Sequence, residues 1–469
     1  MGTSASPAMS AAAGSGPIAV IGGGWAGCAA AVTLAQAGLA VTLFEQANTL
    51  GGRARRVALD GLALDNGQHL LVGAYRQALD LMATVHGSSR VAALFHRLPL
   101  TLAPFGAPRS SAITLRAWRA PAPFNLAAGI LNARGLSWRE RLALVRGFSQ
   151  IARAGYRCPP AQTVAECFAG TPRPVMDGVW SPLCIAALNT PPERASAQVF
   201  ANVLREAFTA RATASDFLIP AGDLSALFPD AAARYVGTHG GEVRTGTVVR
   251  RVAPGARDVA VRTKGGEERF VAAIVAVGPH QLAATVGTGN HPEDREPAPE
   301  PWGAALAQIA DFEYESITTV YVAYPAAARL PAPIARLDDA PGHWVFDRSA
   351  ALPADPSGEA RSLLAVVISA NGPHDALDHA TLAARVDAQL RRLAPAMPVP
   401  LWWRVIAERR ATYACTPALS RPGAGRLAAG LYLAGDYTID ELPPTLEAAT
   451  RSGVKAARAL LADLGPGTR

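Results

Sequence analysis

The opening 45 residues contain the feature that most constrains the fold, a strand, a glycine-rich turn, a helix and a second strand in that order. An apolar strand leads into Gly22-x-Gly24-x-x-Gly27, and the second strand ends at Glu45. In such a βαβ unit the first glycine permits a sharp turn, the second admits a pyrophosphate, and the third lets the helix pack closely on the strand. Glu45 stands where an acid accepts ribose hydroxyls. We therefore predict a parallel α/β sheet that binds a dinucleotide.

A second pair of glycines indicates which dinucleotide is bound. The stretch NTLGGRAR begins three residues after Glu45 and resembles the GG-R motif of the large flavoenzyme superfamily that includes amine oxidases, phytoene desaturases and GDP-dissociation inhibitors. The resemblance implies non-covalent FAD, with Gly52 bringing backbone to the pyrophosphate and Arg53 contacting phosphate and ribose. Nicotinamide enzymes have no such second motif. The alternative interpretation of Gly51-Gly52 is an ordinary turn.

The loop LDNGQHL at 64–70 follows the second motif. In the superfamily the equivalent loop runs along the isoalloxazine ring, which implies that Gly67 and Gln68 contact the flavin. His69 is a candidate catalytic acid, because histidine exchanges protons near neutral pH. The alternative is that His69 only satisfies the backbone of its own loop.

The C-terminal segment is predicted to complete the same site. LYLAGD at 431–436 resembles the superfamily's AGD motif, which implies that Gly435 and Asp436 bind near the ribityl and phosphate groups. A helix opens near Leu446, after two prolines, and its N-terminal dipole would favour negative charge on a reduced flavin. Val249 is placed to contact the adenine.

These motifs predict an α/β fold in which a Rossmann-like FAD-binding domain of the GR2 flavoprotein type carries an inserted mixed-sheet and helical substrate domain. The predicted segments are a flexible tail (1–16), FAD-binding segments (17–100, 235–285 and 425–469) and substrate-domain segments (101–234 and 286–424). Apolar and alternating runs predict strands at 248–252, 270–277, 316–324 and 363–369.

One helix of the inserted part is both amphipathic and basic. Ser137 and Glu140 have the spacing of a capping box at its start. Its predicted apolar face consists of Leu142, Val145, Phe148, Ser149 and Ala152, and its arginines are Arg139, Arg141, Arg146 and Arg153. A helix of this kind either packs on its own domain with solvated arginines or lies on a membrane surface.

Composition excludes several classes of protein. Half of the 469 residues are hydrophobic and 17% are charged, which is unlike a disordered chain. The formal net charge is +7, yet no run of basic residues supports nucleic-acid binding. Five scattered cysteines favour a reducing compartment over a disulfide framework or a zinc site. We expect a cytoplasmic protein, with peripheral attachment to the inner membrane as a variant of that expectation.

Five longer blocks narrow the resemblance. The blocks are LALDNGQHLLVGAYR, VWSPLCIAALNTPPERAS, GHWVFDRS, AERRATYACTP and LAGDYTIDELPPTLEAATRSG. Together they resemble the hydroxysqualene dehydroxylase family of bacterial hopanoid pathways, and the likeness spans nearly the whole chain. The chain departs from the expected pattern at Tyr437, where we expect tryptophan after the AGD motif. The resemblance implies reductive removal of the hydroxyl of a C30 isoprenoid alcohol, with reduced FAD as the electron donor and squalene as the product.

This reaction needs an acid for the departing hydroxyl and aromatic walls for an allylic cation. His69 leads as the proton donor, with Asp65 and Glu447 as alternatives, and Tyr437 is a further catalytic candidate. The aromatic residues considered for the walls are Trp180, Trp402, Trp403, Tyr413 and Tyr437. Upstream squalene-pathway enzymes and a membrane surface are the expected partners.

Three other functions fit parts of the sequence. An oxidative carotenoid or phytoene desaturase would act on a similar hydrocarbon. An amine oxidase of this fold commonly has a lysine near the flavin, and neither Lys264 nor Lys455, the chain's two lysines, is well placed. A prenyl-lipid carrier resembling GDP-dissociation inhibitor would have no use for the motifs around Arg53 and Asp436.

Overall fold

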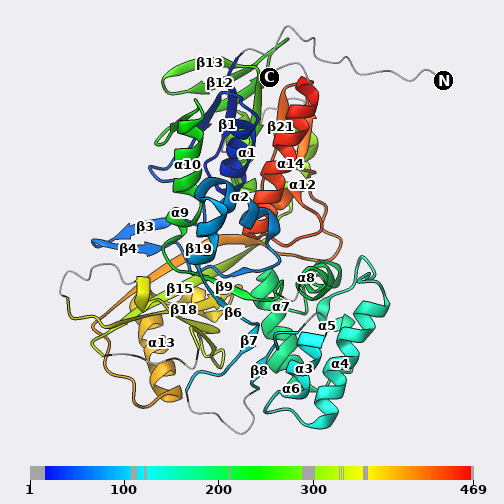
Figure 1. Cartoon of the computed structure of the whole chain (residues 1–469), viewed down its shortest axis with the longest axis vertical. Coiled ribbons are helices and arrows are strands. Elements are labelled where there is room, and N and C mark those ends of the chain that lie inside the picture. The colour runs from blue at the N-terminus through cyan, green and yellow to red at the C-terminus, as the bar shows by residue number, and fades with distance from the viewer. Residues whose placement is uncertain are drawn as a thin grey trace.

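The computed structural model describes residues 16–465, apart from 107–112, 121–123, 210, 212, 288–300, 327, 329, 331 and 352–357. The predicted tail at 1–16 therefore lies outside the described residues, except for its last residue. Across the described part the chain forms two large sheets, with smaller sheets and helices around them (Figure 1).

The first sheet has six strands in the order β10-β2-β1-β14-β21-β20, parallel except for the last pair. Its strands are β1 (Ile18–Ile21), β2 (Val41–Phe44), β10 (Glu242–Arg244), β14 (Ala272–Val275), β20 (Gly425–Ala428) and β21 (Leu431–Leu433). All four residues of β1 and of β2 are buried, which explains why seven of these eight residues are apolar and only Thr42 is polar. Strands from three distant stretches of chain thus share one sheet.

Helices of small residues pack beside this sheet. The helices are α1 (Trp25–Gln36), α2 (Arg76–His86), α10 (Pro229–Thr238) and α14 (Leu446–Leu464). Helices α1 and α14 lie side by side (Figure 1), and a Cβ atom on Gly453 would come within 2.0 Å of the Ala26 carbonyl oxygen. A Cβ atom on Gly27 would come within 1.8 Å of the Gly22 carbonyl oxygen. Gly27 therefore has the packing role predicted for the third glycine.

A small antiparallel sheet extends from the end of the first. It consists of β11 (Arg251–Pro254), β12 (Val259–Thr263) and β13 (Gly266–Phe270). The strand predicted at 270–277 is wrong in extent, because Phe270 ends β13 and β14 ends at Val275. The strand predicted at 248–252 starts only at Arg251, which leaves Val249 in the preceding connection.

The second large sheet has five antiparallel strands in the order β16-β17-β18-β15-β19. Its strands are β15 (Tyr314–Tyr324), β16 (Ile334–Arg336), β17 (Trp344–Asp347), β18 (Ser362–Ser369) and β19 (Trp402–Tyr413). The strands predicted at 316–324 and 363–369 are present as β15 and β18. Alternate side chains of the sheet pack on α13 (His379–Leu393), and the other face points toward the interior.

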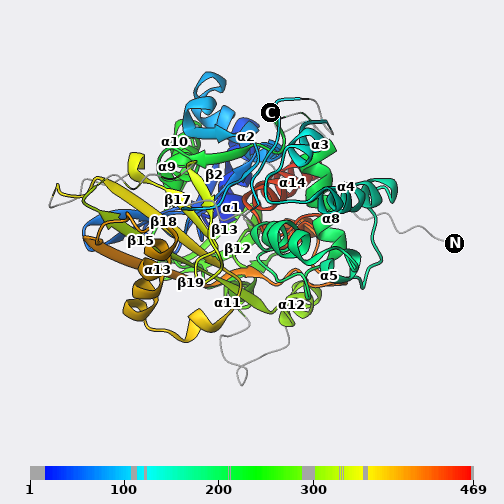
Figure 2. The same ribbon diagram turned by 90° about the horizontal axis from the view of Figure 1, so that it is seen from below.

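A helical layer completes the inserted part, and Figure 2 shows it beside the second sheet. It comprises α3 (Phe124–Leu131), α4 (Trp138–Arg153), α5 (Val164–Cys167), α6 (Arg173–Val175), α7 (Ser181–Leu188) and α8 (Ala197–Thr209). The predicted capping box at the start of α4 is confirmed. The predicted buried face of α4 is wrong in part: Val145 and Phe148 pack against the core as predicted, but Leu142 is exposed, and Leu144, Gly147 and Ile151 are buried instead.

Short elements connect these layers. They are β3 (Arg56–Leu59), β4 (Leu62–Asp65), β5 (Leu71–Val72), β6 (Phe95–Leu98), β7 (Thr101–Leu102), β8 (Leu115–Arg116), β9 (Phe217–Pro220), α9 (Leu224–Leu227), α11 (Pro279–Val286) and α12 (Gly303–Ala310).

Candidate functional site

A cavity of about 600 Å³ is lined by residues of both large sheets and of α7 and α8. One end is built of glycine backbone and charged groups, and the other of aliphatic and aromatic side chains. The cofactor-binding residues predicted from the sequence line this cavity, with the exception of Gly27.

The glycine motifs meet at the polar end. Gly51 donates its N–H to the Gly23 carbonyl oxygen at 2.8 Å, and Gly24 lies beside Gly52. A Cβ atom on Gly24 would find its nearest neighbour, the Gly52 Cα, 3.9 Å away. Backbone from both motifs is therefore open to the cavity, as the approach of a pyrophosphate requires.

Glu45 lies at the same end, and its carboxylate is oriented by backbone. Its Oε2 accepts the Gly23 N–H at 2.7 Å and its Oε1 accepts the Ala47 N–H at 2.8 Å. The Thr247 N–H binds the Glu45 carbonyl oxygen at 2.8 Å, and Val249 lines the cavity close by in sequence. An acid and an apolar side chain thus share this end, which fits a ribose and an adenine.

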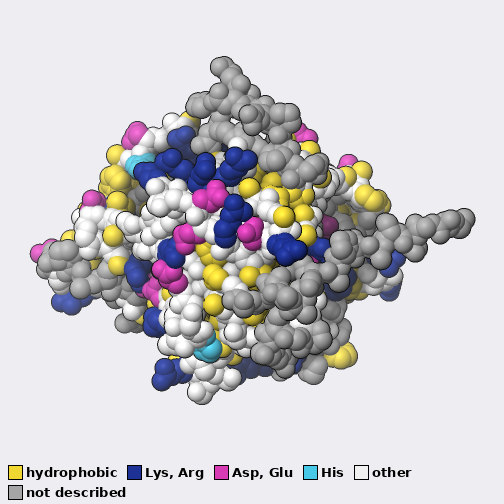
Figure 3. Space-filling view, turned by 90° about the horizontal axis from the view of Figure 1, so that it is seen from above, with side chains coloured by type: hydrophobic (Ala, Val, Ile, Leu, Met, Phe, Trp, Pro, Cys, Tyr) yellow, Lys and Arg dark blue, Asp and Glu magenta, His cyan; other side chains and the backbone are white. Residues whose placement is uncertain are grey.

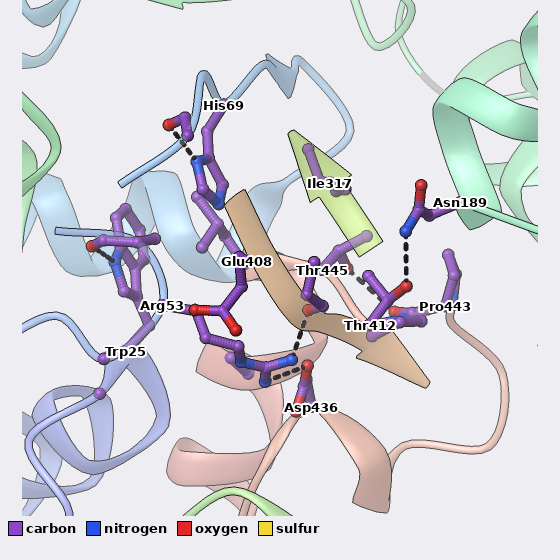
Figure 4. Close-up of a pocket in the computed structure, with 18 of the residues that line it drawn as sticks. Trp25, Arg53, His69, Asn189, Ile317, Glu408, Thr412, Asp436, Pro443 and Thr445 are labelled. Atoms are coloured by element: carbon purple, nitrogen blue, oxygen red, sulfur yellow. Dashed lines mark hydrogen bonds and ion pairs between the residues drawn. The ribbon is translucent and has the colours of Figure 1, made fainter. Parts of the chain in front are cut away.

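Arg53 joins three parts of the chain at the floor of the cavity (Figure 4). Its guanidinium donates to Asp436 Oδ2 at 2.6 Å and to the Ala411 carbonyl oxygen at 2.7 Å. Burial opposes the charge, but the Asp436 carboxylate raises the pKa of Arg53 above its ordinary value. Gly435, which precedes Asp436, has a φ of 150°, a backbone conformation that residues other than glycine rarely adopt.

Two helices begin at the cavity. Gly24 is the N-cap of α1, and Thr445 is the N-cap of α14, where its hydroxyl accepts the Ala448 N–H. Trp25 and Leu446, the first residues of the two helices, both line the cavity. First-turn N–H groups and helix dipoles favour anionic ligand groups. Together with the open glycine backbone, this donor set fits FAD.

The predicted flavin-contacting loop is shaped by Gly67, whose φ is 91°. Gln68 donates its backbone N–H to Thr319 Oγ1 at 3.2 Å and its side-chain Nε2 to the His69 carbonyl oxygen at 2.9 Å. The buried Gln68 Oε1 has no hydrogen-bond partner among the described residues. An orphaned acceptor on a cavity wall fits a ligand that carries an N–H or O–H donor.

His69 lies on the cavity wall, with Nδ1 at 3.0 Å from the Gly67 carbonyl oxygen. Because that oxygen can only accept, Nδ1 carries the proton in the neutral ring and Nε2 is an acceptor. Burial lowers the pKa of His69, so the neutral form predominates at neutral pH. The arrangement therefore favours His69 as a hydrogen-bond acceptor over His69 as an acid.

The other predicted catalytic residues are not among those that line the cavity. Asp65 accepts the Leu224 N–H at 2.8 Å and lies 3.4 Å from Arg348, so it connects β4 to the start of α9. Tyr437 packs behind Gly435, and Glu447 accepts two N–H groups at the start of α2. Each of these three side chains therefore packs or forms hydrogen bonds within the protein, outside the cavity lining.

The aromatic residues considered for the cavity walls are likewise elsewhere. None of Trp180, Trp402, Trp403, Tyr413 and Tyr437 lines the cavity, and Trp180 stacks on Phe168 in the helical layer with ring centroids 4.0 Å apart. The aromatic residues that do line it are Trp25, Phe44, Tyr75, Phe200, Phe208, Phe217, Trp344 and Phe346. They come from β2 and β17 of the two large sheets, from α1, α8 and β9, and from the N-cap of α2, and sequence spacing gave no sign of their convergence.

Sequence reasoning also missed polar residues on β19. Where β15 pairs with β19 the register shifts, so that Glu315 faces Thr412 and Ile317 faces Glu408. Both Glu408 and Thr412 line the cavity. Thr412 Oγ1 accepts Asn189 Nδ2 at 2.9 Å, which leaves its own hydroxyl hydrogen available to a ligand (Figure 4). The only signal was their position in one block, AERRATYACTP, that resembles the dehydroxylase family.

Four carboxylates line the cavity, and three of them are held by an arginine or by two backbone N–H groups. Glu45 is bound by two backbone N–H groups, Asp436 by Arg53, and Glu206 by both terminal nitrogens of Arg451 at 2.7 and 2.9 Å. Glu408 accepts only the Arg410 N–H, through Oε1 at 3.2 Å, within the described part of the chain. Its second oxygen is available for proton exchange with a ligand.

Comparison with known proteins agrees with this geometry. The family model described as flavin containing amine oxidoreductase matches residues 25–461. A hydroxysqualene dehydroxylase of Rhodopseudomonas palustris is 28% identical over 454 residues, which cover 94% of this chain and 98% of the relative. A zeta-carotene desaturase of Synechocystis is 25% identical over 488 residues, covering 95% and 97%.

Solved structures share the fold. Cyclohexylamine oxidase from Brevibacterium oxydans superimposes with a TM-score of 0.66, at 17% identity, over 98% of this chain and all of the other. The lysines considered for amine chemistry are not among the cavity-lining residues: Lys264 lies between β12 and β13, and Lys455 lies within α14.

The Arg53–Asp436 pair generates a prediction about cofactor binding. We expect Asp436→Ala to lower FAD affinity by about 10- to 100-fold, because it frees Arg53 from the orientation that the floor of the cavity requires. FAD occupancy after gel filtration, measured from the flavin spectrum, checks this. Asp440→Ala, which removes an exposed carboxylate four residues away, is the matched control. Full occupancy in Asp436→Ala would contradict the placement of the cofactor.

Asp65 generates a prediction about pH. Burial raises its pKa to about 6 from an ordinary value of 3.8, although the Leu224 N–H and Arg348 act in the opposite direction. The folded protein therefore holds this proton more tightly than the unfolded chain, and raising the pH through that window favours unfolding. We expect the residue to lower the free energy of unfolding by about 3 kcal/mol at most between pH of about 4 and 6.

Asp65→Asn keeps an acceptor for the Leu224 N–H but has no carboxyl group to titrate. The fall in the free energy of unfolding with rising pH should therefore disappear in this variant. Urea unfolding at a series of pH values measures it, and Asp60→Asn, at the exposed turn of the same hairpin, is the control. Parallel pH profiles for wild type and Asp65→Asn would contradict the assignment.

Proposed function

The chain belongs to the family of flavin containing amine oxidoreductases and is an FAD-dependent oxidoreductase, and from this premise we propose its reaction. We propose that it removes the allylic hydroxyl of hydroxysqualene reductively to give squalene. The observation that carries the proposal is one cavity that joins a dinucleotide cradle to an apolar, aromatic-lined chamber. The similarity to hydroxysqualene dehydroxylases over nearly the whole chain supports it.

The balance of the reaction defines what the side chains must do. The alcohol loses its C–O bond, the carbon gains a hydride, and the leaving oxygen takes a proton and departs as water. Reduced FAD, when bound, supplies the hydride. The protein must supply the proton, orient the hydroxyl and keep bulk water away from an electron-deficient carbon.

Glu408 is the proposed proton source. It is the least engaged of the four cavity-lining carboxylates, because only the Arg410 N–H binds it in the described structure, and in its protonated form it donates to the leaving oxygen. The Thr412 hydroxyl donates a hydrogen bond to the same oxygen, and His69 Nε2 accepts one from the substrate hydroxyl. Asn189 holds Thr412 in place from the other side (Figure 4).

The apolar walls serve the cationic stage. Trp344 and Phe346 of β17 and Phe200 and Phe208 of α8 line the chamber. Aromatic faces attract a cation, and apolar walls exclude the water that would otherwise capture it. The chamber has the chemistry that a long hydrocarbon with one hydroxyl requires.

An oxidative desaturase is the second candidate function. The specific observation that favours it is the similarity to zeta-carotene desaturase, over nearly the same share of the chain and with lower identity. Such an enzyme would need the same cradle and an apolar chamber, but no acid for a departing hydroxyl. A lipid carrier without flavin is disfavoured, because the glycine backbone, Arg53 and Asp436 together form a dinucleotide site.

The source of the substrate suggests where the protein works. We propose that upstream squalene-pathway enzymes supply the C30 alcohol and that this protein meets it in the cytoplasm, at the surface of the inner membrane. Among the helices that the structure describes, none is long and apolar enough to cross a bilayer. Contact with the lipid would then be peripheral.

The proposed reaction predicts a change in the flavin spectrum. Anaerobic protein with photoreduced FAD, mixed with hydroxysqualene, should recover the absorbance of oxidised flavin in step with the appearance of squalene in an organic extract. Cyclised or saturated C30 analogues without the hydroxyl should leave the flavin reduced. A flavin that stays reduced with hydroxysqualene would instead favour the desaturase, and a preparation free of flavin would favour a carrier.

The proton donor generates a further prediction. Glu408→Gln keeps the size of the side chain and removes its proton, so we expect the rate of flavin reoxidation to fall by about 100-fold or more. FAD occupancy should remain, because no cofactor-binding residue changes. Glu313→Gln, an exposed carboxylate just before β15, is the control. A wild-type rate in Glu408→Gln would remove Glu408 from the mechanism.

A further inference from the structure

An unusual group of exposed apolar side chains lies on α3, α4 and the segment before them. We call it the α3–α4 face, and its members are Trp118, Phe124, Leu131, Trp138 and Leu142. They are five of the nine large hydrophobic side chains that are exposed in the described part of the chain. Trp138 is 72% exposed and Phe124 is 68% exposed, although both open helices that could have turned them inward. A concentration of this kind marks an interaction surface.

The positive charge of the protein is concentrated in the same stretch of the chain. Residues 113–157 contain eight arginines and one acidic residue, an excess of seven that equals the formal net charge of the whole chain. The arginines are Arg116, Arg119, Arg134, Arg139, Arg141, Arg146, Arg153 and Arg157. The one acid, Glu140, is occupied by the backbone N–H and hydroxyl of Ser137. The rest of the sequence is therefore balanced in charge.

These arginines also lack acidic partners. No salt bridge joins any of the eight to a carboxylate in the described structure. Arg141 instead binds backbone carbonyl oxygens and lies over the Trp138 ring at 4.8 Å. At the opposite end of the molecule acidic and basic side chains are interspersed (Figure 3), and Arg269 there pairs with Asp258 and Glu267.

The α3–α4 face is one aromatic layer away from the cavity. The ring of Phe148, on the inner side of α4, lies 4.6 Å from Trp180 and 5.5 Å from Phe208 between centroids. Phe208 in turn lines the cavity. A partner seated on the α3–α4 face would thus be separated from the substrate chamber by the width of α4 and these rings.

We propose that the α3–α4 face docks on an anionic lipid surface, with Trp138 and Phe124 among the lipid headgroups and the arginines on their phosphates. Mixed apolar and basic side chains suit this partner, because tryptophan rings prefer the interface and arginine binds phosphate. A nucleic acid would leave Leu131 and Leu142 without a role. The inference rests on the proposed function in one respect, that a lipid substrate gives the contact a purpose.

Flotation of the holoprotein with vesicles tests the proposal. We expect binding to vesicles of equal parts phosphatidylglycerol and phosphatidylcholine, weaker binding at high salt, and little binding to phosphatidylcholine alone. The double variant Phe124→Ser/Trp138→Ser should bind the anionic vesicles at least tenfold more weakly. The double variant Arg139→Gln/Arg146→Gln should lose about fivefold per arginine, and only on anionic vesicles.

Matched variants elsewhere provide the controls. Val399→Ser removes an exposed apolar side chain far from the α3–α4 face in sequence, and Arg262→Gln/Arg269→Gln removes two charges near β12 and β13. Both should bind vesicles as wild type does. Unchanged FAD content and thermal stability would establish that each variant is folded.

Vesicle binding does not require turnover, so it separates this inference from the proposed reaction. If hydroxysqualene is the substrate, the α3–α4 face variants should still reoxidise flavin with the detergent-solubilised compound. Their defect in vesicle binding should appear whatever the substrate is. The inference would be overturned if Phe124→Ser/Trp138→Ser bound vesicles as wild type does, or if wild type bound neutral and anionic vesicles equally. It would also be overturned if the wild-type protein bound another protein and no vesicle.

Discussion

The ion pair between Arg53 and Asp436 holds the functional architecture together. The two residues lie 383 positions apart, and the same guanidinium also binds the Ala411 carbonyl oxygen of β19. The Arg53 side chain therefore connects the N-terminal glycine motifs, the segment that follows β21 of the first sheet, and β19 of the second sheet. Removal of the carboxylate would leave a half-buried guanidinium without its charged partner, so this pair links residues of both large sheets at the cavity.

The irregular pairing of β15 and β19 positions the carbonyl oxygen that Arg53 binds. Three residues, 409–411, lie opposite Ser316 where a regular ladder would place one, and the bulge brings the Ala411 carbonyl oxygen to Arg53. The same bulge leaves Glu408 and Thr412 on the cavity wall on either side of it. Bulges commonly re-aim side chains next to active sites, and here one deviation serves both cofactor geometry and proton chemistry.

The residues predicted to bind the cofactor, except Gly27, line one cavity, and each motif among them is local and has residue types with a backbone reason. Gly27 touches Gly22 and Glu45 binds the turn beside it, so short-range spacing was sufficient. The substrate half could not be predicted in the same way. Trp344, Phe208 and Glu408 come from a strand, a helix and a bulged strand that meet only in three dimensions, whereas Trp180 and Tyr437 were plausible by type and are used in packing. Only tertiary contacts distinguish these two groups of residues.

Charge is distributed in a way that suits chemistry through a cation. Inside, Glu45 is held by backbone N–H groups, and Asp436 and Glu206 are paired with arginines, so their charges are largely compensated. Glu408 has no such compensation from an ion pair in the described structure, and once it has given its proton to a leaving hydroxyl its carboxylate faces the electron-deficient carbon across the cavity. The group that starts the cleavage would then stabilise the cation that forms, while none of the eight arginines of residues 113–157 is among the cavity-lining residues.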